Sequence, residues 1–429
     1  MTNQIPSGEP PLGALACPEP EDRPDLWPTT ARRTPDGELA LGGLTVSEIL
    51  ADAPSPVFVL DEADLRGRAA SWSAAMAEEF WSGYGLRGGE AFYAGKAFLT
   101  TQVARIVLQE GMGIDTASRV ELAVGLAGLE KVDGPEATTH ARRLGLHGNG
   151  KTPAEVTTAV RHRVGHLVID SPEEVDHAVA AVHELRRSGD FGADERARVM
   201  VRLTTGIHAG GHEYISTAHE DQKFGLSVST GAARRAIDAI VAADELELAG
   251  LHSHIGSQIL DMAGFREAVG VVLGLRHEIA VDTGHLCPEV DLGGGYGIAY
   301  TGADPVAPSP AQVARTLAEA VRETCERLGD EVPTVSIEPG RAVAGPTTVT
   351  LYTVTGLKRV ELGEGASRLY VSIDGGMSDN IRPALYEAAY TALVANRRPD
   401  PSAGLTRARV VGKHCESGDV VVRDVDLPA

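Results

Sequence analysis

The sequence predicts an α/β protein: a (β/α)8 barrel of the TIM type, followed by a smaller β-rich domain that N-terminal strands join. Three observations predict this fold. Short apolar runs alternate with amphipathic stretches eight times between about residues 88 and 345. A polar side chain or a glycine cluster stands at the end of nearly every apolar run. Beyond residue 345 the segments become β-branched and alternating, without long helical periods.

The barrel is expected over residues 62–345 and the β domain over residues 34–61 and 346–429. Residues 1–33 are rich in proline and are expected to be irregular. A chain of 429 residues is long enough for one large and one smaller domain. The strands before residue 61 are assigned to the β domain because the two ends of a chain often lie together.

The eight barrel strands are expected at residues 91–96, 112–117, 144–149, 166–171, 199–204, 248–256, 289–295 and 334–340. Amphipathic helical stretches lie between them, for example at residues 118–129, 172–189 and 310–329. Eight alternating units favour a closed barrel over an open doubly wound sheet. After the barrel, TTVTLYTVTGLKRVE, RLYVSID and RARVVGKHCESGDVVVRDV are expected to form antiparallel strands.

Composition excludes several classes of protein. The net charge of -21 argues against a nucleic-acid partner, and no run of 18 apolar residues could cross a membrane. The first 22 residues contain no Lys or Arg, which argues against a targeting peptide. The four cysteines are far apart and show no metal-binding spacing, so a cytoplasmic location is expected.

The ends of the predicted strands carry most of the candidate functional groups, and a barrel places its active site at these C-terminal ends. They are Lys96, Asp115, His147, Asn149, Asp170, Arg202, His254, the glycines 293–295 and Glu338. Lys96 stands in the apolar segment FYAGKAF and is expected to be buried. Burial would favour its neutral, nucleophilic form.

Two motifs at the last strands suggest a phosphate-containing ligand. LGGGYGIAYTG can be a simple turn or a phosphate cradle of backbone N–H groups, but it fails the dinucleotide pattern because Ile298 replaces the third glycine. IEPGRAVAG places Glu338 and Arg341 around a turn. They can form an ion pair there, or they can face a ring nitrogen and a phosphate or carboxylate.

Histidines could indicate a metal, yet their spacing does not. His252 and His254 share one strand face, but no third ligand is visible near them in the sequence. A ring-stacking or acid–base histidine is therefore favoured, with Ser257 as a nearby hydrogen-bond donor. The insertion HAGGHEYISTAHEDQKFGL carries three histidines without metal-type spacing and is expected to cover the barrel mouth; these are His208, His212 and His219. No metal site is predicted.

A barrel lysine, a phosphate loop, a carboxylate at a turn and a stacking histidine together are what a pyridoxal 5'-phosphate enzyme requires. The ordered motifs resemble those of the fold-type III pyridoxal phosphate-dependent decarboxylases, and among them the diaminopimelate decarboxylase family. The resemblance runs from about residue 55 to the end. It rests on FYAGKA, GIDTASRVEL, LHGNGK, HEYISTAHEDQKFGL, HSHIGSQ, DLGGGYGI, EPGRAVAG, DGGMSDNIRPALY and HCESGD.

The resemblance implies a role for each matching residue. Lys96 would carry the cofactor, His254 would stack on its ring, and Glu338 would pair with the pyridine nitrogen. The remaining cofactor contacts would be Ser257, Gly293, Gly294, Gly295, Pro339, Gly340 and Arg341, with Asp115 near the lysine. Cys415 would be the catalytic proton donor. The substrate would be bound by Arg341, Arg382, Tyr386 and Glu416.

The implied reaction is the decarboxylation of meso-2,6-diaminopimelate to L-lysine and CO2, the last step of lysine biosynthesis. The family also implies a homodimer in which HCESGD reaches into the neighbouring subunit's active site. Two alternatives remain: a decarboxylase of another basic amino acid or of a polyamine precursor such as carboxynorspermidine, or a catalytically impaired homologue that still binds pyridoxal phosphate.

The chain departs from the family in two places. The insertion reads STAHEDQKFG where the family usually has STGHEDSKFG, which changes Ala218 and Gln222. Family members also continue beyond VVRDVDLPA into a segment with a GAYG-type tyrosine. We therefore expect the sequence either to be truncated or to lack that part of the site.

Overall fold

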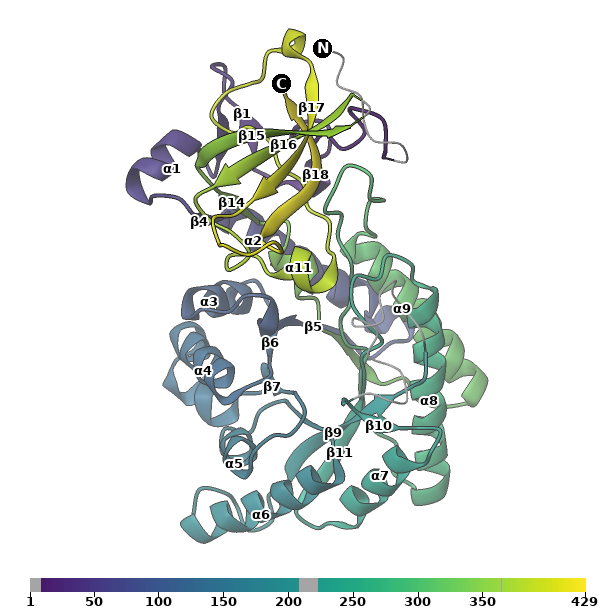
Figure 1. Cartoon of the computed structure of the whole chain (residues 1–429). Coiled ribbons are helices and arrows are strands. Elements are labelled where there is room, and N and C mark those ends of the chain that lie inside the picture. The colour runs from purple at the N-terminus through teal and green to yellow at the C-terminus, as the bar shows by residue number, and fades with distance from the viewer. Residues whose placement is uncertain (1–8, 208–222, 364) are drawn as a thin grey trace. The chain divides into compact units, whose positions relative to one another are not determined.

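The computed structural model describes residues 9–207, 223–363 and 365–429 (Figure 1). The chain divides into two compact units. The first contains Met1–Asp64, Ile298–Ala307 and Pro346–Ala429, and the second contains Leu65–Gly297 and Pro308–Gly345.

The second unit is a closed parallel barrel of eight strands. They follow one another around the barrel in sequence order, and the last pairs with the first. The strands are β5 (Gly89–Ala94), β6 (Gly113–Thr116), β7 (Leu144–Leu146), β8 (His166–Ile169), β9 (Ala197–Thr204), β11 (Leu246–Ser253), β12 (Glu289–Asp291) and β13 (Thr334–Ile337). A further short strand, β10 (Leu226–Ser227), pairs with the end of β9.

Helices surround this ring of strands, as Figure 1 shows. They are α2 (Glu62–Glu79), α3 (Thr101–Gln109), α4 (Arg119–Asp133), α5 (Pro153–Arg161), α6 (Pro172–Ser188), α7 (Ala232–Ala242), α8 (Ala263–Thr283), α9 (Pro310–Leu328) and α10 (Arg341–Ala344). Short 3-10 helices lie at η2 (Ser82–Tyr84), η3 (Gly95–Ala97) and η4 (Pro135–His140).

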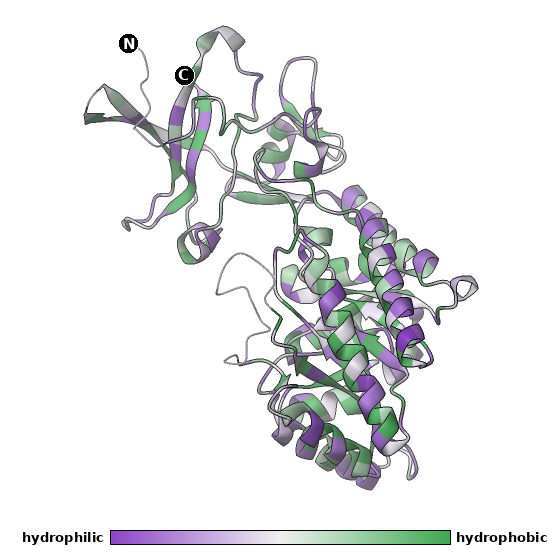
Figure 2. Ribbon diagram, turned by 90° about the vertical axis from the view of Figure 1, so that its right-hand side faces the viewer, coloured by the Kyte–Doolittle hydropathy of each residue, from purple (hydrophilic) through white to green (hydrophobic). Residues whose placement is uncertain are grey.

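The amphipathic pattern explains why the helices pack onto the strands. In α9 the buried side chains recur every three to four residues, as at Val313, Leu317 and Val321, and form one apolar stripe. Figure 2 shows hydrophilic and hydrophobic residues alternating around the barrel helices. A capping box of Ser309 and Gln312 begins α9, and Gly329 in the left-handed conformation ends it.

The prediction of an eight-stranded barrel is confirmed, and each predicted strand overlaps an observed one. The observed strands mostly end one to three residues earlier than predicted. The residues beyond those ends, including Lys96 and Gly293–Gly295, therefore lie in the loops at the barrel mouth rather than in the strands.

The first unit consists of small sheets. Its main sheet has the order β15 (Val354–Gly363), β16 (Ala366–Ile373), β17 (Leu405–Val411) and β18 (Val420–Pro428). The N-terminal strands do join this unit, because β4 (Val57–Leu60) pairs with β14 (Thr348–Leu351). A separate small sheet contains β1 (Arg32–Arg33), β2 (Leu39–Leu41) and β3 (Leu44–Thr45). The helical elements are α1 (Val46–Asp52), α11 (Arg382–Tyr386), η1 (Pro24–Leu26) and η6 (Pro401–Ala403).

The prediction that all strands after the barrel are antiparallel is wrong at one place. β16 and β17 pair in parallel, whereas β15–β16 and β17–β18 are antiparallel. The physical reason is the long connection from residue 374 to 404, which contains α11 and brings the chain back to the same end of the sheet. A parallel pair requires such a crossover, and strand periodicity alone does not reveal it.

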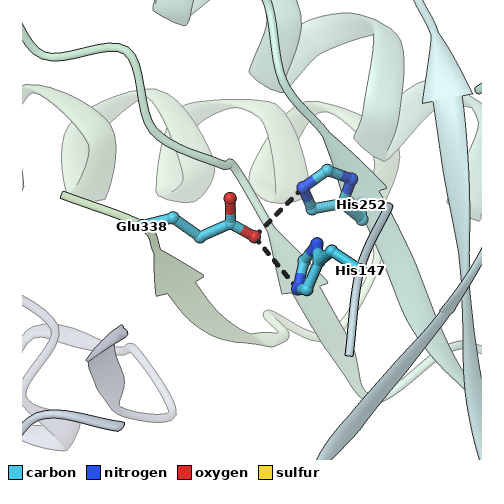
Figure 3. A group of neighbouring side chains, drawn as sticks. All are labelled: His147, His252 and Glu338. Atoms are coloured by element: carbon cyan, nitrogen blue, oxygen red, sulfur yellow. Dashed lines mark ion pairs between the residues drawn. The ribbon is translucent and has the colours of Figure 1, made fainter. Parts of the chain in front are cut away.

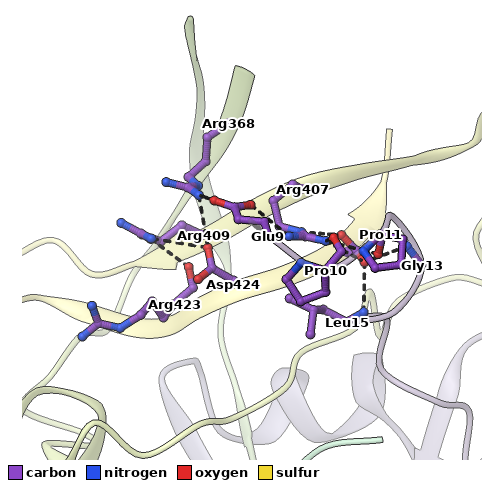
Figure 4. Close-up of polar contacts among 11 residues, drawn as sticks. Glu9, Pro10, Pro11, Gly13, Leu15, Arg368, Arg407, Arg409, Arg423 and Asp424 are labelled. Atoms are coloured by element: carbon purple, nitrogen blue, oxygen red, sulfur yellow. Dashed lines mark hydrogen bonds and ion pairs between the residues drawn. The ribbon is translucent and has the colours of Figure 1, made fainter. Parts of the chain in front are cut away.

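The N-terminal segment is tied to the last two strands by a buried ion pair (Figure 4). Arg407 Nε lies 2.7 Å from Asp426 Oδ1, and the side chains are 2% and 0% exposed. Asp426 Oδ2 also accepts the backbone N–H groups of Gly13 and Leu15 at 2.7 and 3.0 Å. Arg407 also pairs with Glu9 at 3.0 Å. Residues 9–15 are therefore fixed to the sheet, although they form no helix or strand.

We expect Asp426→Ala to destabilise this unit by about 3–5 kcal/mol, because it leaves the Arg407 guanidinium buried without its main partner. Urea unfolding monitored by circular dichroism measures the loss. Asp424→Ala is the matched control on the same strand. Asp424 is 29% exposed and its partners Arg409 and Arg368 are 21% and 13% exposed, and such partly exposed pairs contribute less than about 1 kcal/mol. Equal effects of the two substitutions would contradict this account.

No helix among residues 9–207, 223–363 and 365–429 is long and apolar enough to cross a membrane.

Candidate active site

The C-terminal ends of the barrel strands bring together charged and polar side chains that are far apart in the sequence. Asp115 lies on β6, His147 directly follows β7, and Glu338 directly follows β13; their exposed fractions are 6%, 5% and 4%. Charged groups that are buried this close together must be stabilised by opposite charges or hydrogen bonds from one another. Asp170, Arg202 and His252 are likewise buried at the ends of β8, β9 and β11.

Glu338 is the centre of a cluster with two histidines (Figure 3). Its Oε1 lies 3.1 Å from His252 Nε2 and 3.3 Å from His147 Nε2. His147 Nε2 is also 3.1 Å from Asp115 Oδ1. The two histidine rings meet edge to face with centroids 4.9 Å apart. His147 therefore stands between the two carboxyl groups.

The surroundings shift the pKa values of the two carboxyl groups in opposite directions. Burial and the charge of Glu338 raise the pKa of Asp115 well above its ordinary value. Burial also acts to raise the pKa of Glu338, but His252 and Lys96 outweigh burial and bring that pKa below the ordinary value. Burial and the neighbouring His252 lower the pKa of His147. These surroundings therefore favour the ionised form of Glu338, the neutral form of His147 and the protonated form of Asp115.

His254 lies just beyond β11 and is oriented by the glycine loop. Its Nδ1 accepts the backbone N–H of Gly294 at 3.1 Å. Burial and the charges of Lys96 and Arg202 lower its pKa well below the ordinary value, so the ring is neutral. Because Nδ1 accepts a hydrogen bond, the proton of this neutral ring is on Nε2. The ring orientation is thus set by the main chain.

The glycines after β12 permit a backbone approach that other residues would block. A Cβ atom on Gly293, Gly294 or Gly295 would lie 2.3–2.4 Å from a backbone oxygen, and Gly293 and Gly295 have φ of +68° and +109°. Asp291 Oδ1 accepts the N–H of Gly293 at 2.8 Å and fixes the start of the loop. This is the geometry of a loop built for main-chain contact with a ligand.

Arg341 and Ser257 lie next to each other at the barrel mouth. Arg341 Nη2 donates to Ser257 Oγ at 2.9 Å. Ile259, two residues after Ser257, donates its N–H to Gly295 O at 2.9 Å, so the Ser257 loop is bonded to the glycine loop. A guanidinium, a hydroxyl and a glycine loop are thus gathered from three neighbouring strands. Such a set suits an anion, and phosphate in particular.

The expectation that Lys96 is buried is wrong: its side chain is exposed. It lies in η3, directly after β5, where the chain has left the apolar strand and reached the barrel mouth. Its charge nevertheless acts on Asp115, His254 and Glu338, so it belongs to the same group of side chains. Exposure makes its amine accessible to a ligand.

The residues predicted to bind substrate or donate a proton from outside the barrel all belong to the first unit. Arg382 and Tyr386 are both in α11, with the guanidinium carbon 5.2 Å from the ring centroid. Cys415 and Glu416 are exposed in the loop between β17 and β18. His208, His212 and His219 lie outside the described residues.

The role of His147 was missed by sequence reasoning, which placed it at a strand end without a function. The expectation that His252 has no ligand-type neighbours is also wrong. His147, His252 and Glu338 offer ligand atoms within 4.8 Å of one another, contributed by β7, β11 and β13. Only the closed barrel brings these three strand ends together. Their common position at the C-terminal end of a strand was the one signal in the sequence.

Several polar atoms of this cluster are buried without a hydrogen-bond partner among the described residues. They are Glu338 Oε1, Asp115 Oδ1 and both ring nitrogens of His252. A polar atom that is buried without a hydrogen-bond partner destabilises the fold. Native proteins keep such atoms mainly at functional sites. The site therefore offers an ionised carboxylate, an anion cradle and an accessible amine to one ligand. These groups fit a cofactor with a ring nitrogen, a phosphate and an aldehyde.

The barrel matches a known family. Residues 64–345 match the family "Pyridoxal-dependent decarboxylase, pyridoxal binding domain". The fold and the site therefore define a pyridoxal-dependent decarboxylase, which confirms the class of enzyme that the sequence predicts.

The whole chain resembles one group within that class. It is 42% identical over 412 residues to the diaminopimelate decarboxylase of Mycobacterium tuberculosis, covering 94% of this chain and 85% of the relative. It is 36% identical to that of Bacillus subtilis, covering 93% and 84%. The crystal structure of the M. jannaschii diaminopimelate decarboxylase with L-lysine superposes with a TM-score of 0.80 at 26% identity, covering 94% of this chain and 85% of that one. The chain belongs to the diaminopimelate decarboxylase family.

Proposed function

We propose that the protein uses pyridoxal 5'-phosphate to decarboxylate meso-2,6-diaminopimelate to L-lysine and CO2, the last step of lysine biosynthesis. One observation supports this most. The barrel mouth joins Lys96, an ionised Glu338 and the Gly293–Gly295 loop, in a chain that is 42% identical to a diaminopimelate decarboxylase over 94% of its length.

Residues of the barrel mouth would hold the cofactor. Lys96 would attach it through its aldehyde, Glu338 would face the ring nitrogen, and His254 would lie against the ring. The phosphate would be bound by Ser257, Gly293, Gly294, Gly295 and Arg341, with Pro339 and Gly340 shaping the turn that places Arg341. When bound, pyridoxal phosphate supplies an electron sink for the electrons that remain when CO2 leaves.

The protonation states support these assignments. An ionised Glu338 can accept a hydrogen bond from a protonated ring nitrogen and keep that nitrogen protonated. The raised pKa of Asp115 favours its protonated form, which limits the negative charge at the site. His254 is neutral and leaves the positive charge at this site to Lys96 and Arg341.

We expect Gly294→Ala to weaken cofactor binding by roughly tenfold to a hundredfold. The new Cβ would lie 2.3 Å from the backbone oxygen of Glu338, so the loop must shift. Such overpacking costs about 1–3 kcal/mol. Titration of the cofactor-free protein with pyridoxal phosphate, followed by absorbance, measures the change. Gly270→Ala in α8 is the control, because its Cβ would meet nothing within 4 Å. Unchanged affinity in Gly294→Ala would rule out the proposed cradle.

Groups of the first unit would recognise the substrate. Arg382 and Tyr386 would bind the distal carboxylate, and Glu416 would bind the distal ammonium. In the reaction the bond between Cα and the carboxylate breaks. The Cys415 thiol then donates a proton to that carbon, and the thiolate regains a proton from water. No oxidant or reductant is needed.

We also propose a cytoplasmic homodimer in which the loop of Cys415 and Glu416 completes the partner subunit's site. Two observations support it. Both side chains are exposed on a loop of the first unit. The four cysteines, Cys17, Cys287, Cys325 and Cys415, are free thiols, as expected in a reducing compartment.

A substrate panel tests the proposed specificity. L-lysine has one carboxylate only. With that carboxylate at the reacting end it has no distal carboxylate, so it would leave Arg382 unpaired. We expect kcat/KM for meso-diaminopimelate to exceed that for L-lysine, L-ornithine and carboxynorspermidine by at least about a thousandfold. Preference for any of the other three would replace the proposed substrate. Turnover of none, with cofactor bound, would indicate an impaired homologue.

A further inference from the structure

The two segments of the first unit that carry the proposed substrate-side groups cross each other. One runs from Asp374 through α11 and contains Arg382 and Tyr386. The other, residues 412–419, contains Cys415 and Glu416. Residues 413–418 are exposed, whereas Asp419 at the end of this loop is 3% exposed. A carboxylate buried at the base of an exposed loop requires a structural reason.

Asp419 joins the two segments through both of its carboxylate oxygens. Oδ1 accepts the backbone N–H of Met377 at 2.6 Å, and Oδ2 accepts that of His414 at 2.7 Å. Each oxygen thus serves a different segment. Two charge-assisted bonds to main-chain donors satisfy the buried charge without an opposite charge.

Two further contacts lie at the same crossing. Lys413 donates its N–H to Gly375 O at 3.1 Å, and Ser378 Oγ lies 2.8 Å from His414 Nε2. A Cβ on Gly376 or Gly412 would lie 2.3–2.8 Å from the Asp419 carboxylate oxygens. Glycine at both positions is therefore what allows the carboxylate to reach the crossing.

We propose that Asp419 is a positioning residue that holds the loop of Cys415 and Glu416 in register with the segment leading to Arg382 and Tyr386. Because Cys415 and Glu416 lie on this loop, the position from which they would reach the partner subunit's site depends on this carboxylate. The inference rests on the proposed function for its catalytic consequence. Its structural part stands independently of the substrate.

Asp419→Asn tests the inference. The amide keeps the size of the side chain, but its NH2 group faces a backbone donor in place of an acceptor, so one bond is lost. We expect amide hydrogen exchange at Met377 or His414 to become about tenfold faster or more, and Cys415 to change its rate of alkylation. We expect kcat for meso-diaminopimelate to fall about tenfold or more, and the affinity for pyridoxal phosphate to stay within about twofold.

Two further variants make the result decisive. Gly376→Ala leaves both donors and the carboxylate in place but puts a Cβ 2.6 Å from Asp419 Oδ1, so it should act in the same direction. It replaces Asp419→Asn if that variant does not fold. Asp400→Asn is the matched control, because this carboxylate accepts hydrogen bonds from the N–H and the hydroxyl of the nearby Ser402 in η6 and joins no second segment.

Unchanged exchange at Met377 and His414 in Asp419→Asn, or an equal change in Asp400→Asn, overturns the inference. Faster exchange without any loss of kcat overturns its catalytic part. If exchange accelerates but the unaltered enzyme does not release lysine, the proposed function fails and the positioning role remains.

Discussion

Lys96→Ala is expected to abolish covalent attachment of pyridoxal phosphate and to lower decarboxylation by at least about a thousandfold. The amine is the one nucleophile proposed for the cofactor aldehyde, and it is exposed at the end of β5. Alanine keeps the Cβ atom and removes the amine together with the methylene groups that carry it. Borohydride reduction of the loaded enzyme, followed by peptide mapping, should place the cofactor on the peptide containing Lys96 and nowhere else.

Lys131→Ala in α4 is the control, because this lysine is also exposed but lies in a helix rather than at a strand end. It should load and react like the unaltered enzyme. Reduction that labels another lysine, or a Lys96→Ala variant that still carries reducible cofactor, would contradict the assignment of Lys96.

Cys415→Ala is expected to bind pyridoxal phosphate with unchanged affinity but to turn over about a hundredfold to ten-thousandfold more slowly. This is the usual range for loss of a positioned proton donor. The expected split between binding and turnover follows because Cys415 belongs to the first unit and is not among the barrel residues that would hold the cofactor. Steady-state rates of CO2 release together with cofactor titration measure it. Lys413→Ala, in the same exposed loop, should change neither quantity.

Mixing the two inactive variants tests whether two subunits build one site. If Cys415 acts in the partner subunit, a dimer of one Lys96→Ala and one Cys415→Ala subunit has one complete site. With random exchange half of the dimers are mixed, so about a quarter of full activity should return. No recovery after verified subunit exchange would mean that each subunit builds its own site.

Much of the barrel could be predicted because its signals are local. Each strand is a short apolar run, and each helix has one apolar stripe such as Val313, Leu317 and Val321 in α9. The parallel pairing of β16 with β17 could not be predicted, because it depends on the path of the chain through residues 374–404 and not on strand periodicity.

The site shows the same division between local and non-local information. The glycine loop and the EPGR turn are continuous motifs, and the structure brings Gly295, Ser257 and Arg341 together through direct hydrogen bonds or adjacent residues. The contacts of His147 with Asp115 and Glu338 join three strands, so only barrel closure reveals them. The exposure of Lys96 was mispredicted because its apolar neighbours belong to β5, which ends two residues earlier.

The most direct test of the proposed function is the product formed from meso-diaminopimelate. Purified protein loaded with pyridoxal phosphate is incubated with the substrate, and amino acid analysis and CO2 release are measured on the same sample. We predict that L-lysine and CO2 appear in equal amounts. Protein that carries the cofactor on Lys96 but releases neither product would contradict the account.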